Sequence, residues 1–313
     1  MADSVTKPLL ILAFNRPAHV KRLIDSLRPY RPQKILVGID GPREKNKSDK
    51  EKIAQVLDEV NKIDWTSDVE LRVRENNLGL RFAVADAVTW VIDKYGEVIV
   101  VEDDVEVGPE FLQFMSLMLD KFRDDDEVFH VSGYNLVPKS EVCFPGEAIR
   151  KSSIPESYAW ATWSRAWEAY DPYLNWAKKL SISELKSLLG KVVPAIIWKV
   201  NFRDAERELI STWAYRWIGS IWSRGGVCIS PNRNLVNYTG QSLGTHTRFP
   251  TSQVELPIES VLSLEVPLMT RLDSEADFWI QRNIFRASMP GVFIRIAQSV
   301  GLMLIKAVRG KLQ

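Results

Sequence analysis

The chain has 313 residues, with 41 Lys and Arg against 40 Asp and Glu and a net charge of +1. This balance argues against a broad basic surface for nucleic acid, and 45% hydrophobic residues are enough for a full globular core. The two cysteines, Cys143 and Cys228, have neither metal-ligand spacing nor the number for a disulfide framework. A reducing cytoplasm therefore fits best, and we recognise no signal peptide and no apolar span of about 20 residues.

Strand and helix patterns alternate over the first half of the chain. Apolar, often β-branched runs predict strands at residues 9–14, 34–39, 69–73, 98–101 and 128–132. Apolar residues at helical spacing predict helices at residues 17–27, 51–63, 80–93 and 111–122. The charged stretch around Asp49 is expected to be solvated. Such alternation is typical of a mainly parallel sheet with helices on both faces.

Three consecutive carboxylates, Glu102, Asp103 and Asp104, follow the fourth predicted strand. Clustered carboxylates repel one another unless a cation neutralises them, and oxygen ligands suit Mg²⁺ or Mn²⁺. The run predicts either a metal–diphosphate site or a solvated acidic turn. Ligands of such sheets bind beyond the carboxyl ends of the strands, which favours the site. Polar residues follow the other strands at the same edge: Asn15, Arg16, Asp40, Asn76 and Asn77.

The second half of the chain is rich in tryptophan, with eight of the 11 residues lying from Trp160 to Trp222. After a predicted loop at 135–157, Trp160, Trp163 and Trp167 recur at the spacing of one helix stripe. Aromatic faces suit sugar rings, but tryptophan is also a frequent core residue, and both interpretations stay open. Further helices are predicted at 183–189, 195–209 and 212–223, and a short strand at 227–230.

The tail at 292–311 is mostly apolar, and its Arg295 and Lys306 share one face of a helix because they lie eleven residues apart. Its uncharged stretch, 296–305, is too short to span a bilayer. A basic stripe on an apolar helix is typical of a helix lying in a membrane interface. The alternative is a helix packed on the body or in the interface of a homo-oligomer.

Six segments resemble GT-A glycosyltransferases, in particular bacterial enzymes distantly related to eukaryotic N-acetylglucosaminyltransferase I. They are LLILAFNRP (9–17), ILVGIDGP (35–42), NNLGLRFAV (76–84), VIVVEDDVEVGPEF (98–111), YAWATWSRAW (158–167) and the stretch 211–247. The resemblance implies a GT-A (Rossmann-like) α/β fold whose mostly parallel sheet is flanked by helices. Residues 1–134 would bind the nucleotide sugar, 135–265 would form a Trp-rich helical acceptor-binding half, and 266–313 a C-terminal amphipathic helical tail.

The resemblance also implies roles for single residues. Asp104 would bind Mn²⁺ or Mg²⁺ directly, with His246 as a second candidate ligand that closes over the diphosphate. Glu102 and Asp103, which complete the equivalent of the family's DXD motif, would contact the donor sugar, the ribose or metal-bound water. The nucleotide-binding residues would be Phe14, Arg16, Asp40, Asn77, Leu78, Gly79 and Arg81. The residues on the acceptor side would be Trp160, Trp163 and Trp213.

The chain departs from this pattern at Ala214, where many relatives carry the aspartate that serves as the base of an inverting reaction. Alanine cannot take a proton, so three explanations stay open. Another carboxylate serves, the alanine replaces a natural aspartate, or the protein is inactive or retains configuration. The candidate substitutes are Glu156, Asp171, Asp204 and Glu206.

We therefore predict a metal-dependent glycosyltransferase, with an inverting reaction favoured, that moves a hexosyl, deoxyhexosyl or N-acetylhexosaminyl group from a nucleotide sugar. The acceptor would be a glycan or lipid-linked hydroxyl in bacterial surface polysaccharide synthesis, at the inner face of the cytoplasmic membrane. One alternative is a catalytically impaired scaffold subunit that binds sugar nucleotides, which Ala214 favours. The other is a nucleotidyltransferase, which the lack of a Gly-rich loop after the first strand opposes.

Overall fold

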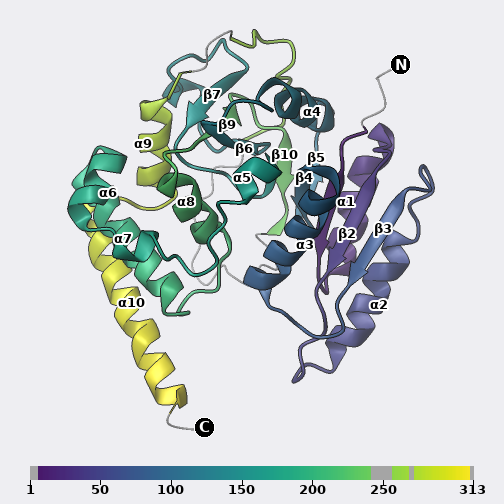
Figure 1. The fold of residues 1–313 in the computed structure, drawn as a ribbon, viewed down its shortest axis with the longest axis horizontal. Coiled ribbons are helices and arrows are strands. Elements are labelled where there is room, and N and C mark those ends of the chain that lie inside the picture. Colours follow the sequence, from purple (N-terminus) through teal and green to yellow (C-terminus); the bar gives the residue numbers. More distant parts are fainter. Residues whose placement is uncertain (1–5, 241–255, 268–270, 311–313) are drawn as a thin grey trace.

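The computed structural model describes residues 6–240, 256–267 and 271–310, and its centre is a mixed sheet (Figure 1). The eight strands follow the order β3-β2-β1-β4-β8-β6-β9-β7. They are β1 (Leu9–Ala13), β2 (Ile35–Ile39), β3 (Val69–Val73), β4 (Glu97–Glu102), β6 (Val128–Ser132), β7 (Ile149–Ser152), β8 (Ala159–Trp163) and β9 (Val227–Pro231). Helices flank this mostly parallel sheet, so the predicted α/β fold class is confirmed.

Ten α-helices lie within the described residues. They are α1 (Pro17–Leu27), α2 (Ser48–Val60), α3 (Leu80–Tyr95), α4 (Phe111–Lys121), α5 (Ser164–Trp167), α6 (Ile182–Leu189), α7 (Val192–Glu206), α8 (Ala214–Ser223), α9 (Ser274–Asn283) and α10 (Met289–Gly310). All predicted helices of the first half are present, and so are those predicted over α6, α7 and α8.

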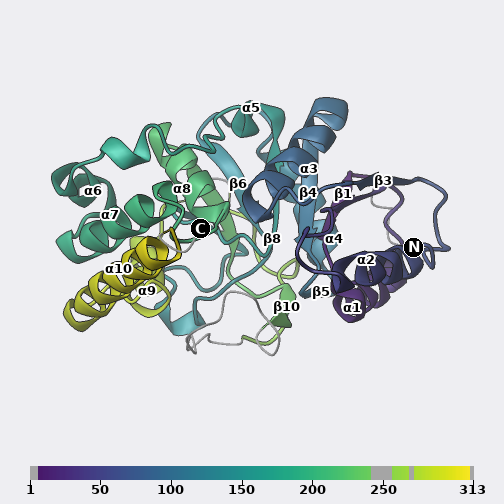
Figure 2. The same ribbon diagram turned by 90° about the horizontal axis from the view of Figure 1, so that it is seen from below.

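Strands β1 to β4 are mutually parallel and place their carboxyl ends at one edge of the sheet. Leu12 of β1 lies opposite both Gly38 of β2 and Glu102 of β4. Figure 2 shows α1 and α2 on one face of these strands and α3 on the other. The α3 helix packs closely, because a Cβ atom at Gly38 would lie 2.8 Å from the Cβ atom of Ala87.

Residues 159–163 form strand β8, so the helix predicted from Trp160, Trp163 and Trp167 is wrong. The strand runs antiparallel between β4 and β6, with Trp163 opposite Glu97. All five of its residues are buried, which removes the alternation of polar and apolar residues that marks a half-buried strand. The spacing of the three tryptophans therefore predicted the wrong element.

Three short strands are not predicted by the sequence. Strand β7 lies inside the predicted loop at 135–157 and pairs with β9 at the edge of the sheet. Strands β5 (Val105–Val107) and β10 (Val236–Tyr238) form a separate antiparallel ribbon. Strand β5 directly follows the three carboxylates Glu102, Asp103 and Asp104, which we call the acid run. Strands from both sides of residue 134 join one sheet, and the division at 134 and 265 stays a prediction.

Helix α10 runs along α7, and its C-terminal end projects beyond the neighbouring helices (Figure 1). Residues Met289–Val308 are long and apolar enough to cross a membrane, judged by length and composition alone. The prediction that no such span exists is therefore wrong. The helix begins earlier than predicted, and two charges over 20 residues leave its mean hydropathy at 1.6.

Candidate functional site

A cleft of about 760 Å³ opens at the carboxyl ends of β1, β2 and β4. This volume lies in the range of small-molecule sites. Most of the predicted nucleotide-sugar residues line it: Phe14, Arg16, Asp40, Asn77, Gly79, Glu102, Asp103 and Asp104. Tyr158 and Tyr238, which the sequence reasoning missed, complete the wall beside the acids. Leu78 and Arg81 are not among the lining residues, and Arg81 forms an ion pair with Glu208 at 3.2 Å.

Arg16, which lies just after the end of β1, forms ion pairs with two carboxylates of the acid run. Its Nη1 atom lies 2.9 Å from Oδ2 of Asp104 and 3.2 Å from Oδ1 of Asp103. Glu102, the last residue of β4, accepts a hydrogen bond at 3.3 Å from the indole N–H of Trp213. Among the residues that the structure describes, one guanidinium therefore faces three carboxylates, which leaves an excess of negative charge when all three are ionised.

The electrostatic cost of this cluster appears in its pKa values. Burial raises the pKa of the Glu102 carboxyl to about 8, and the charges of Asp104 and Asp103 add to the shift. Burial likewise raises the pKa of Asp103 to about 7, although Arg16 opposes the shift. The acids are thus poised to hold protons near neutral pH, unless a second cation joins the guanidinium.

Asp104 is the residue best placed to receive that cation. Its Oδ1 atom is buried and has no hydrogen-bond partner among the described residues. The ribbon fixes its backbone, because the N–H and hydroxyl of Thr239 donate to its carbonyl at 2.8 and 3.1 Å. A Cβ atom at Gly240 would lie 2.7 Å from Oδ2 of Asp104, so this glycine keeps the acid accessible.

The oxygen atoms of this run fit a hard divalent ion such as Mg²⁺ or Mn²⁺. Within residues 6–240, 256–267 and 271–310, no group of three or more His, Cys, Asp or Glu side chains has the geometry of a metal cage. Mg²⁺ is usually bound by one or two carboxylates together with substrate phosphates. The second predicted ligand, His246, lies outside the described residues.

Asp40 lies in the cleft but is engaged with the turn that opens α3. Its carboxylate accepts hydrogen bonds from the backbone N–H groups of Gly41, Leu78 and Gly79 and from the side chain of Asn77, at 2.8 to 3.0 Å. Burial raises the pKa of Asp40, and the backbone donors oppose the shift. The structure thus gives this carboxylate a clear role in shaping the 77–79 turn.

An ion pair that the sequence did not reveal lies beside the cleft, where Arg43 is one of the lining residues. Asp49 itself is fully buried, whereas the residues around it are mostly exposed, so the expectation of a solvated stretch holds for its neighbours and fails for Asp49. The Arg43 side chain binds Asp49 at 2.7 and 2.8 Å, and the Asn15 amide donates to the same acid at 2.7 Å. The Arg43 guanidinium lies 5.3 Å from the centre of the Phe14 ring. These contacts fix the lining residues Phe14 and Asn15.

The predicted acceptor-side tryptophans lie in the core. Trp160 is fully buried and stacks on Trp213 with ring centres 5.1 Å apart. Trp163 points to the opposite face of β8 and donates its N–H to the carbonyl of Leu119. Neither Trp160 nor Trp163 exposes a ring face to a sugar, so we correct their assignment to core packing. Trp213 is buried too, but its N–H reaches the acid run through Glu102.

Ala214 is the first residue of α8 and directly follows Trp213. The carboxylates proposed in its place have other partners. Asp204 is buried against Arg295 and Ser299 of α10, while Glu206 lies 3.8 Å from a lysine. Asp171 accepts hydrogen bonds within its own turn. Glu156 is buried, and burial raises the pKa of its carboxyl to about 7.

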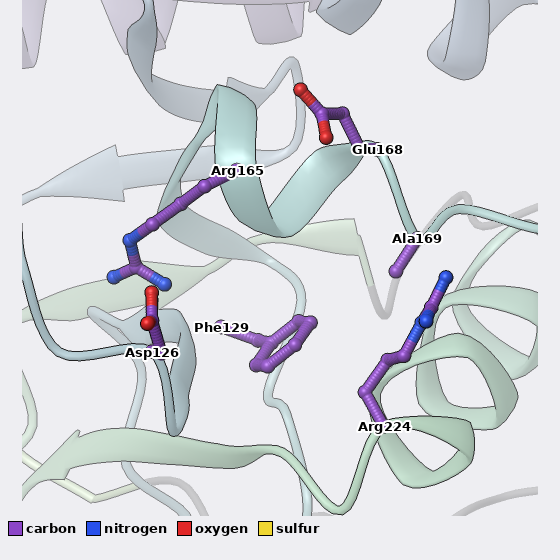
Figure 3. Close-up of a pocket in the computed structure, with 6 residues that line it drawn as sticks. All are labelled: Asp126, Phe129, Arg165, Glu168, Ala169 and Arg224. Atoms are coloured by element: carbon purple, nitrogen blue, oxygen red, sulfur yellow. The ribbon is translucent and has the colours of Figure 1, made fainter.

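A second pocket of about 270 Å³ lies at the opposite edge of the sheet, beyond the end of β8 (Figure 3). Phe129 lies between Arg165 and Arg224 in this view. The Arg165 guanidinium donates to three backbone carbonyls, so it holds the local fold. The remaining lining residues are Asp126, Glu168 and Ala169. The pocket contains none of the predicted site residues.

Comparison with known proteins gives one family. A profile of the GNT-I family matches residues 2–180, more than half of the chain. A search of curated protein sequences gives no significant match.

Two solved structures show a distant similarity to this chain. HddC from Yersinia pseudotuberculosis, complexed with GMP-PN, is 14% identical over 56% of this chain and 87% of its own, with a TM-score of 0.36. The mannosyltransferase PcManGT from Pyrobaculum calidifontis, in complex with GDP-Man and Mn²⁺, is 10% identical over 71% of this chain and 77% of its own, with a TM-score of 0.34. At these scores the similarities carry no argument about function.

Proposed function

The chain belongs to the GNT-I family of glycosyltransferases and uses a nucleotide sugar, and from this premise we propose a metal-dependent transfer at the cleft beside β4. The single observation that carries the proposal is the buried acid run with its one guanidinium. Asp104 offers a buried oxygen there that has no hydrogen-bond partner within the described part of the chain, and Glu102 and Asp103 have raised pKa values. Burying such a cluster destabilises the protein unless its site serves a cation.

Asp104 would hold the ion, with Asp103 beside it, and Mn²⁺ or Mg²⁺ fits their oxygen atoms. When bound, the ion supplies a Lewis acid that stabilises the charge developing on the departing diphosphate. Arg16 would exchange part of its contact with Asp103 and Asp104 for the diphosphate oxygens, because it already points into the cleft. Trp213 would keep Glu102 oriented toward the donor sugar.

As the acceptor we propose a hydroxyl of a glycan or a lipid-linked sugar, in the synthesis of a bacterial surface polysaccharide. An inverting reaction is the favoured outcome, and it requires a base that takes the acceptor proton. A cytoplasmic location is supported by the cysteines Cys143 and Cys228, which both have free thiols.

The test is the release of nucleoside diphosphate from a panel of UDP-, GDP- and dTDP-sugars, with Mn²⁺ or with EDTA. We expect release with one base family, dependent on the metal and lost in Asp104→Asn. The control is Asp126→Asn, which removes a carboxylate from the pocket at the opposite sheet edge and should leave release unchanged. Release that persists in EDTA or in Asp104→Asn would contradict the proposal.

A second candidate, a scaffold subunit that binds but does not transfer, is favoured by Ala214. Ala214→Asp separates the two functions, because the new carboxylate would follow Trp213 at the edge of the acid run. A gain of at least tenfold in transfer would show an intact site that lacks only its base. Donor binding without turnover in both the natural chain and this variant would support the scaffold.

A further inference from the structure

Helix α10 is docked on the protein through its polar side. Arg295 contacts Asp204 and Asn201 of α7 at 2.8 Å, and the Ser299 hydroxyl donates to Asp204 at 2.7 Å. About two turns further, the Lys306 ammonium donates to the backbone carbonyl of Arg207 at 2.7 Å. The basic stripe recognised in the sequence therefore faces the body of the protein. This is the reverse of the usual arrangement, in which a surface helix turns its apolar face inward.

The outward side of α10 is apolar along its whole length. Phe293, Leu304 and Val308 expose 68%, 62% and 59% of their surface. Further exposed apolar side chains of this helix are Met289, Ile294, Ile296, Val300 and Ile305. A continuous apolar face of this length marks an interaction surface, because isolated soluble proteins rarely expose one. We call these eight residues the outer face of α10.

We propose that the outer face of α10 lies on an anionic phospholipid surface. The charge of this part of the chain supports that partner. From Phe278 to Gln313 the sequence holds six Lys and Arg and no Asp or Glu. Arg295 pairs with Asp204, and no acidic residue within this segment offsets its other Lys and Arg. Basic residues that flank an apolar helix face are the features that bind anionic membranes.

The polar contacts between α10 and α7 indicate that α10 lies along the membrane surface and does not cross the membrane. The contacts from Arg295 to Lys306 extend over about 16 Å of helix, at 1.5 Å per residue. If α10 crossed the membrane, these polar contacts would enter the hydrocarbon together with the buried charge of Asp204 and the neighbouring Arg203. Such charges are costly there. When the polar side of α10 faces α7 and the outer face lies on lipid, Arg295, Ser299 and Lys306 keep their partners.

A second copy of the chain is the competing occupant of the outer face. A two-fold contact through the same face would bring two positively charged segments together. An anionic lipid surface compensates that charge, whereas a copy of the chain does not. The charge pattern therefore favours lipid.

The experiment is cosedimentation of the full chain with vesicles of phosphatidylcholine alone or with 30 mol% phosphatidylglycerol. We expect binding to the anionic vesicles that weakens at high salt, and at least a tenfold loss in Leu304→Glu and in Phe293→Glu. Leu117→Glu is the matched control, because Leu117 is an exposed leucine of α4, outside the outer face. It should bind like the natural chain. Melting curves check that all three variants are folded.

Three results would overturn the proposal. Equal binding of Leu304→Glu and Leu117→Glu would exclude the outer face. A stable dimer in lipid-free buffer that Leu304→Glu converts to monomer would assign the face to a second copy. Vesicle-bound protein that resists extraction at high salt and alkaline pH would show a crossing helix. None of these outcomes depends on glycosyl transfer, so the proposal stands or fails separately from the proposed function.

Discussion

Replacing Arg16 with glutamine should destabilise the protein by an amount that a divalent cation restores. At 2.9 and 3.2 Å, and with an effective dielectric constant of about 20, each contact of Arg16 with Asp104 and Asp103 corresponds to about 5 kcal/mol of attraction. The cost of burying the guanidinium offsets part of this. Proton uptake by Glu102 and Asp103, with pKa values of about 8 and 7, offsets more near neutral pH.

We therefore expect Arg16→Gln to lower the free energy of unfolding by about 3 kcal/mol, as for other broken buried pairs. A chain of 313 residues has an unfolding entropy of about 0.7 kcal/mol per kelvin, so Tm should fall by about 5 °C. Mn²⁺ at about 100 times its Kd, without nucleotide, should raise the free energy of unfolding of the variant by about 2.7 kcal/mol. The shift should be larger in the variant than in the natural chain, because its acid run carries one more uncompensated charge.

The assay is differential scanning fluorimetry at pH 7.5, with and without Mn²⁺. The matched control is Arg74→Gln, since Arg74 lines the same cleft and its partner Asp86 keeps a second arginine, Arg72, at 3.0 Å. Mn²⁺ should give Arg74→Gln no more than the shift of the natural chain. If Mn²⁺ fails to raise the Tm of Arg16→Gln, or raises that of both variants equally, the acid run does not bind the ion.

Two further predictions concern buried carboxylates. Because the pKa of Glu156 is raised from 4.5 to about 7, the folded state keeps a proton that the unfolded chain has released, and stability is lost as pH rises between these values. Glu156→Gln should remove about 3 kcal/mol of this pH dependence in melting curves from pH 5 to 8, and parallel curves would contradict the shift. Asp40→Asn should lower both stability, by about 1–3 kcal/mol, and nucleotide affinity, because three backbone N–H groups lose a charged acceptor. Urea denaturation and calorimetric titration check this, and unchanged stability would mean that the turn holds without the charge.

The carboxyl-end edge of the sheet could be predicted from the sequence because each signal there is local. A buried strand followed by Glu102, Asp103 and Asp104 is visible in the sequence, and the parallel strands bring Arg16 to the same edge. The order of strands and turns sets that edge. The packing of single side chains was not needed for this prediction.

The remaining features depend on contacts between distant residues. Asp49 reads as a surface charge until the fold brings Asn15 from 34 residues away to meet it. Fully buried β8 gives no alternating pattern that would separate a strand from a helix. The periodicity of α10 defines two faces but does not say which one meets α7. The partner Asp204 decides that, and it lies 91 residues before Arg295 in the sequence.

The most direct measurement is isothermal titration of UDP and GDP into the natural chain and into Asp104→Asn, each with Mn²⁺ and with EDTA. We predict that one of these nucleotides binds the natural chain only when Mn²⁺ is present. Under that condition, Asp104→Asn should lose at least tenfold in affinity. Equal affinity in Mn²⁺ and EDTA, or an Asp104→Asn variant that binds as tightly as the natural chain, would contradict a metal–diphosphate site at the acid run.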